Sequence, residues 1–120
     1  MNGPGHPDVA LARQLFAPLI PDLAIRSTEF ETDVDVVDDE LIELLAAEID
    51  AACAGLATAI PAGDEAAIRE HAHALQGMGG AASVSDVSVV GEEFSAAARQ
   101  QQFERCAALL HALQQWRDAW

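Results

Sequence analysis

The feature that most constrains this chain is a series of apolar residues that recurs every three or four positions between Leu41 and Ile60. Its members are Leu41, Leu45, Ile49, Ala52, Leu56 and Ile60. This spacing places all six side chains on one face of an α-helix, so a long amphipathic helix is predicted over residues 38–60. Acidic residues at 38–40 suit the positive end of its macrodipole. Such a helix must bury its apolar face against other parts of the chain.

The remaining pattern predicts an all-α fold. Further helices are expected at residues 64–82, 86–101 and 103–119, with the segments "PAGD" (61–64) and "SVSD" (83–86) as interruptions between helices. Apolar residues make up 51% of the chain, which excludes a disordered protein. Four helices with short connections favour an antiparallel four-helix bundle.

The N-terminal third is less regular. Residues 1–7 contain two glycines and two prolines and are expected to be a flexible tail. A short helix is predicted at 8–17, with Asp8 as its N-cap, and it should cap one end of the bundle. Residues 22–37 are interpreted as a connection rather than a strand. Residues 8–120 then form a single domain.

The charge balance restricts the partners. The formal net charge is −14, from six Lys plus Arg and twenty Asp plus Glu. Nucleic-acid binding and attachment to an anionic membrane both require a basic surface, so we expect no nucleic acid and no membrane. The acidity either keeps a small monomeric domain soluble or steers a basic partner toward it, and both interpretations stay open.

The two cysteines, Cys53 and Cys106, fall at apolar positions of predicted helices. The N-terminus "MNGPGHPDVA" has neither the basic nor the apolar region of a secretory signal. No apolar run approaches the roughly 20 residues that span a bilayer. We therefore expect reduced core thiols in a cytoplasmic protein.

The segment "HAHALQGMGG" places three glycines and two histidines inside a predicted helix. A glycine costs roughly 1 kcal/mol relative to alanine there, so three of them need a reason. At 100° per residue, His73, Gly77 and Gly80 fall on the outer face, with Arg69 and Gln76 beside them. Exposed helical glycines remove side-chain bulk, so that another surface can approach a neighbouring group. The pattern indicates an accessible, nucleophilic histidine within a docking surface.

The other histidines carry less information. His71 and Gly79 turn toward the core, where His71 is expected to bond a neighbouring helix and Gly79 to allow close packing. Because positions i and i+2 of a helix point about 200° apart, His71 and His73 cannot share one ion, and no metal site is expected. His6 and His111 have no supporting pattern. Trp116 and Trp120 either close the end of the bundle or form a partner patch.

His73, Leu75 and Gly77 match a known motif. The segment resembles the phosphorylation site of histidine-containing phosphotransfer (HPt) domains, whose pattern is His-x-Leu-Lys-Gly. The family's small and apolar positions farther along are taken here by Ser83, Val87, Val90, Gly91 and Phe94. The resemblance covers about residues 36–118 and agrees with the helix count.

This resemblance implies a phosphorelay intermediate rather than an enzyme. His73 would accept a phosphoryl group from an aspartyl phosphate on the receiver domain of a response regulator or hybrid sensor kinase, and pass it to another receiver. No cofactor is expected on the chain itself, because the receiver supplies Mg²⁺, and no Gly-rich nucleotide loop is present. Gly77, Gly80, Gln76 and Arg69 would contact the phosphoryl group or the partner.

One residue departs from the family pattern. Gln76 stands where the family usually has lysine, and a neutral amide gives hydrogen bonds roughly half as strong as charge-assisted ones. Arg69, one turn before His73, is expected to compensate in part.

Two alternatives remain. A helical adaptor could bind a receiver or kinase domain without being phosphorylated, and the missing lysine favours it. A ligand or metal carrier would need inward-facing polar residues, which the apolar stripes do not show.

Overall fold

The helices of the computed structural model follow the apolar periodicity closely. The structure describes residues 7–29, 39–82 and 84–120. Six helices are assigned there: α1 (Val9–Phe16), α2 (Leu23–Glu29), α3 (Asp39–Ala62), α4 (Glu65–Ala81), α5 (Ser85–Arg99) and α6 (Phe103–Ala119). The predicted all-α class is confirmed for this part of the chain. Within it, none of the helices has the length and apolar character needed to cross a membrane.

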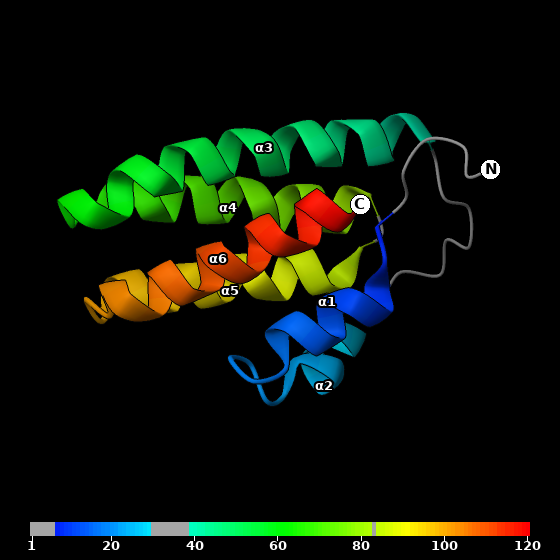
Figure 1. Cartoon of the computed structure of the whole chain (residues 1–120), viewed down its shortest axis with the longest axis horizontal. Coiled ribbons are helices and arrows are strands. Elements are labelled where there is room, and N and C mark those ends of the chain that lie inside the picture. The colour runs from blue at the N-terminus through cyan, green and yellow to red at the C-terminus, as the bar shows by residue number, and fades with distance from the viewer. Residues whose placement is uncertain (1–6, 30–38, 83) are drawn as a thin grey trace.

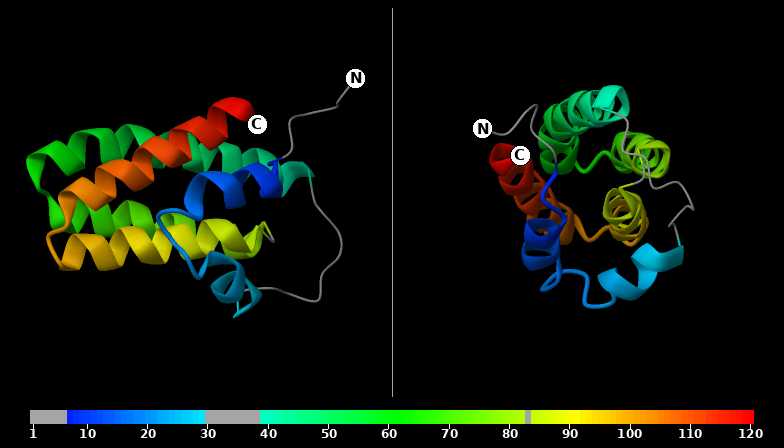
Figure 2. Two further views of the ribbon diagram at one scale, coloured as in Figure 1. Left: turned by 60° about the horizontal axis from the view of Figure 1, so that its bottom comes forward. Right: turned by 90° about the vertical axis from the view of Figure 1, so that its right-hand side faces the viewer.

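The four longest helices, α3 to α6, lie side by side (Figure 1). α3 packs against α4 and α6, and α5 packs against the same two helices. The end-on view in Figure 2 shows these four around a common centre, with α1 and α2 outside them. Consecutive members of the four run in opposite directions along the long axis (Figure 1).

The core lies where the apolar stripes meet. Its largest side chains are less than 2% exposed and come from α3 to α6 as well as from the N-terminal segment: Phe16, Ile20, Leu45, Ile49, Leu56, Ile68, Leu75, Phe94, Leu109, Leu113 and Trp116. Each contributes about 1.5–3 kcal/mol through burial. The predicted stripe of α3 is buried apart from Leu41, which is half-buried.

The turn between α3 and α4 shows how the proline and glycine of the segment 61–64 act. Pro61 was expected to end α3, yet the helix continues to Ala62. A proline in the last turn removes few helical hydrogen bonds, so it is tolerated there. Gly63 then adopts a left-handed φ of 65° and reverses the chain. Asp64 caps α4, as its carboxylate accepts from the backbone N–H of Ala67 at 3.1 Å.

The turn between α5 and α6 uses the same backbone shape without a glycine. α5 ends at Arg99, two residues before the predicted end. Gln101 has a φ of 57°, which costs about 1–2 kcal/mol in a residue with a Cβ. The N–H groups of Gln101 and Gln102 donate to the carbonyls of Ala98 and Ala97 at 3.0 and 2.8 Å, and these bonds hold the turn.

The N-terminal segment differs most from prediction. Residues 22–37 were interpreted as a connection, but Leu23–Glu29 forms α2, and residues 30–37 lie outside the described part. Seven residues are too few to show a clear repeat of apolar positions, so the sequence pattern does not indicate this helix. In the structure it packs against α5. The predicted helix 8–17 is α1, and Asp8 caps it as expected. Instead of capping one end, α1 packs along the side of α5 and α6.

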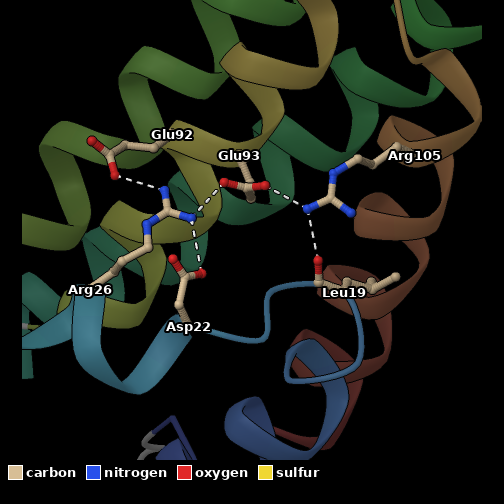
Figure 3. A network of polar contacts seen from close by, with 6 residues as sticks. All are labelled: Leu19, Asp22, Arg26, Glu92, Glu93 and Arg105. Atoms are coloured by element: carbon tan, nitrogen blue, oxygen red, sulfur yellow. Dashed lines mark hydrogen bonds and ion pairs between the residues drawn. The ribbon is translucent and has the colours of Figure 1, made fainter.

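An ion-pair network joins α2 to α5 and, through Glu93, to α6 (Figure 3). The guanidinium of Arg26 donates to Glu93 at 2.6 Å and to Glu92 at 3.0 Å. Arg105 on α6 donates to the same Glu93 carboxylate at 2.5 Å and to the carbonyl of Leu19 at 2.7 Å. Glu93 is therefore shared by cations from two helices, and α2 is held firmly against α5.

A second polar contact lies under α1. Asp86 is 3% exposed in the first turn of α5, where its carboxylate accepts from Nε of Arg13 at 3.1 Å and from the hydroxyl of Ser27. The segment 83–86 was expected to be an interruption, whereas α5 begins at Ser85. A buried carboxylate requires such partners, and here α1 and α2 supply them.

Both cysteines are free, as expected. Cys106 is fully buried and Cys53 is half-buried. Burial, with the nearby carboxylate of Asp50, raises the pKa of the Cys53 thiol to about 11. Trp116 is buried, and its indole N–H donates to the carbonyl of Asp8 at 2.9 Å, so it anchors the start of α1.

Candidate functional site

His73 lies on the exposed face of α4, as the helical wheel predicts. The opposite face of α4 is fully buried through Ile68, Ala72 and Leu75, each 0% exposed. Because these three side chains set the rotation of the helix, they also turn His73 toward solvent. The imidazole is therefore accessible to a partner molecule.

An open groove of about 800 Å³ runs beside His73, between α4 and α5. α4 contributes Arg69, His73 and Gln76 to its lining, and α5 contributes Ser95 and Arg99. Of the residues predicted for the site, the structure thus brings Arg69, His73 and Gln76 into one groove.

The three glycines of α4 have different surroundings. A Cβ added at Gly77 would meet nothing within 4 Å, in agreement with a cleared outer surface. A Cβ at Gly79 would lie 2.7 Å from the backbone nitrogen of Ser88, so Gly79 permits close contact with α5. Gly80 was expected outside as well, but it is half-buried, and its Cβ would lie 4.0 Å from Oγ of Ser88. α5 approaches this end of α4 and covers Gly80 in part.

The backbone of Gln76 is held tightly by α5. A Cβ at Gly91 would lie 2.6 Å from the carbonyl oxygen of Ala72 and 2.9 Å from the nitrogen of Gln76. The hydroxyl of Ser88 donates to the carbonyl of Gln76 at 2.9 Å. α4 is thereby fixed one turn after His73, and the half-buried Gln76 side chain lines the groove.

His71 faces the other neighbour of α4. Its half-buried ring fills the space over Gly55 on α3, where an added Cβ would lie 2.1 Å from Nε2. The expected hydrogen bond to a neighbouring helix is not found among the described residues. His71 packs on α3 while His73 is exposed, so the two rings point apart as predicted.

The arginines around the groove differ in how they are engaged. Arg26 reaches the groove from α2, but its guanidinium is held by Glu92 and Glu93. Arg69 has one exposed carboxylate neighbour, Glu65, at 3.9 Å. Arg99 makes no ion pair or hydrogen bond with a described residue and is exposed. Two cationic groups that line the same groove as His73 are therefore available to a ligand.

Metal-binding geometry is not found in this region. Across residues 7–29, 39–82 and 84–120, no three His, Cys, Asp or Glu side chains are grouped closely enough to hold an ion.

Sequence reasoning missed the wall of the groove that α2 and α5 build. The apolar positions Val87, Val90 and Phe94 are buried as expected, and Ser83 lies outside the described residues. The sequence pattern contains no signal for Arg99, because its place follows from a contact between helices: Gly91 opposes Ala72, and the two helices run in opposite directions. Two further turns of α5 then bring Arg99 alongside the start of α4. Arg26 was missed as well, since its helix was not predicted.

Comparison with known proteins gives one match. The family model described as Hpt domain matches residues 40–119, which include α4, α5, α6 and all of α3 except Asp39. α1 and α2 lie outside the matched range. No curated protein and no solved structure matches the chain.

Proposed function

Because the chain belongs to the Hpt domain family, whose members carry phosphoryl groups on histidine in two-component signalling, we propose that it is a phosphorelay intermediate with His73 as its phosphoacceptor. The observation that supports this most directly is the position of His73. It is exposed on α4, between a groove that contains arginines and the open surface at Gly77. Within this proposal, α3 to α6 form the antiparallel four-helix bundle of a cytoplasmic, monomeric carrier.

The reaction requires little from the carrier. A neutral nitrogen of His73 attacks the phosphorus of an aspartyl phosphate on a receiver domain. The P–N bond forms as the P–O bond to the aspartate breaks, and the aspartate leaves as a carboxylate. The same steps in reverse pass the phosphoryl group to a second receiver. Mg²⁺ bound by the receiver would stabilise the charge on the phosphoryl oxygens.

The surface around His73 suits a rigid partner that approaches along α4. Gly77 projects no side chain, so another backbone can come within contact distance of the helix one turn from the imidazole. Gly91 and Ser88 hold α4 in place, so the histidine is presented without a rearrangement of the helix. Pre-organisation of this kind lowers the entropic cost of docking.

The proposal is tested with a phosphorylated receiver. Acid-labile, alkali-stable label should appear on the wild-type chain and be absent from His73→Gln. His111→Gln is the matched control, because His111 is an exposed histidine on α6, away from the groove, and this variant should keep the label. Label that persists in His73→Gln would contradict the assignment of the phosphoacceptor.

A second candidate is an adaptor that binds a receiver or kinase domain without phosphorylation. Gln76 favours it, because the motif position that usually carries a lysine has no charge. Stable binding to a receiver with no label on any histidine would support this adaptor.

A further inference from the structure

The six positively charged side chains of this acidic chain differ in how closely carboxylates pair with them. The chain has no lysine, and its arginines are Arg13, Arg26, Arg69, Arg99, Arg105 and Arg117. Four of them contact a carboxylate at 3.1 Å or less: Arg13, Arg26, Arg105 and Arg117. These four stabilise contacts between helices. Arg69 and Arg99 have no comparable role among the described residues.

Both remaining arginines line the groove that contains His73. They come from different helices, so their guanidinium groups approach the groove from its two walls, α4 and α5. The contact of Arg69 with Glu65 is exposed and 3.9 Å long, and an ion pair of this kind contributes little to stability. Neither cation would lose much by turning toward a ligand.

The groove is far less acidic than the chain as a whole. Three arginines and two glutamates line it, and Glu93 and Glu65 also contact two of these arginines, whereas the whole chain carries −14. The two glutamates are Glu70 and Glu92, and Glu92 is engaged by Arg26. Because Arg99 has no carboxylate partner among the described residues and Arg69 only a distant one, a doubly charged anion is repelled less here than over most of the remaining surface.

We propose that Arg99 and Arg69 together form an anion site for the phosphoryl group of His73, and that they supply the positive charge that Gln76 lacks. This inference rests on the proposed function and adds Arg99 to the residues that act in it. Planar guanidinium groups pair with phosphate oxygens through two parallel hydrogen bonds, which suits a group held between two helices. The half-buried Gln76 completes the site as a neutral donor.

The test uses phosphoramidate, a small phosphoryl donor that needs no docking surface. The imidazole of His73 displaces ammonia from phosphorus, so a P–N bond to histidine replaces the P–N bond of the donor. The initial rate of phosphohistidine formation is followed by ³¹P NMR for the wild type, Arg69→Gln, Arg99→Gln and Arg117→Gln. Arg117 is the control for charge, because it pairs with Asp50 on α3 and does not line the groove.

We expect Arg69→Gln and Arg99→Gln each to slow labelling roughly tenfold, as befits the loss of a charge-assisted hydrogen bond. Arg117→Gln should label at the wild-type rate, and Arg99→Lys should keep most of it. Thermal unfolding of the Arg99 variants should match the wild type, because no described contact is lost. The second ionisation of the phosphoryl group, read from its ³¹P shift, should move to higher pH in Arg99→Gln, since a nearby cation favours the dianion.

Two other outcomes separate the inference from the function. Equal rates for Arg69→Gln, Arg99→Gln and Arg117→Gln would overturn the anion site and leave His73 as phosphoacceptor. A wild-type chain that takes no label on His73 would overturn both.

Discussion

The hydroxyl of Ser88 on α5 donates a 2.9 Å hydrogen bond to the backbone carbonyl of Gln76, one turn of α4 beyond His73. Ser88 is fully buried, so this bond is shielded from water. Together with Gly91, it makes the contact between α4 and α5 the support on which the exposed histidine rests.

Gly91→Ala should destabilise the protein by about 1–3 kcal/mol, the usual range for an overpacked core. The added methyl group would lie 2.6 Å from the carbonyl oxygen of Ala72 and 2.9 Å from the nitrogen of Gln76, and backbone atoms cannot move aside cheaply. Urea denaturation measures the change. An unchanged midpoint would show that the two helices separate easily.

Gly77→Ala should have the opposite effect on stability from Gly91→Ala and raise the free energy of unfolding by up to about 1 kcal/mol. Alanine has the higher helix propensity, and the added Cβ meets nothing within 4 Å. Gly77→Leu should fold equally well but slow transfer from a phosphorylated receiver, while labelling by phosphoramidate stays normal. Receiver transfer at the wild-type rate in Gly77→Leu would place the docking surface elsewhere.

Gln76→Lys tests how far the arginines replace the usual lysine. In the wild-type background it should change the rate of phosphotransfer only slightly, because Arg69 and Arg99 already lie beside the groove. In an Arg99→Gln background it should restore most of the lost rate. If Gln76→Lys has no effect in either background, position 76 takes no part in the chemistry.

Glu93→Gln should lower the free energy of unfolding by about 1–3 kcal/mol at neutral pH, since Arg26 and Arg105 lose a shared partner. Burial acts to raise the pKa of Glu93, but hydrogen bonds from Arg26 and Arg105 outweigh it and hold this pKa below its usual range. A carboxylate with a depressed folded pKa contributes stability above its unfolded pKa and loses that contribution as the pH falls through the folded value.

The difference in stability between the wild type and Glu93→Gln should therefore be constant above about pH 5 and shrink in more acid solution. Denaturant titrations at several pH values measure it, with Glu104→Gln, an exposed carboxylate on α6, as the control. A stability difference between the two proteins that grows as the pH falls would contradict the depressed pKa of Glu93.

Gln101→Gly should stabilise the protein by up to about 1 kcal/mol, because the left-handed φ of 57° strains any residue with a Cβ. The gain is smaller than the strain, since glycine also increases the entropy of the unfolded chain. Gly63→Ala, at φ 65° in the turn between α3 and α4, should destabilise it for the same reason. Thermal unfolding of both variants gives the comparison.

Local pattern predicted much of this protein. The long helices repeat an apolar residue every three or four positions, so their existence and buried faces follow from the sequence, and so does the outward direction of His73. The motif around His73 also indicated the family that the match over residues 40–119 shows. The bounds predicted for the last helix agree with α6, and the ends of the other predicted helices were off by one or two residues, because capping contacts and turn geometry determine them.

The features that the sequence could not predict depend on contacts between distant segments. α2 is too short for a clear period, and it is held against α5 by Arg26 together with the contact of Ser27 with Asp86. Arg99 is an ordinary surface residue in the sequence, and it reaches the site only because α5 packs closely against α4 at Gly91.

The sequence by itself therefore determined the helices and the exposed histidine, since both depend on the period of one helix. Only the tertiary structure decided which charges surround that histidine, because the register between helices brings together residues far apart in the chain.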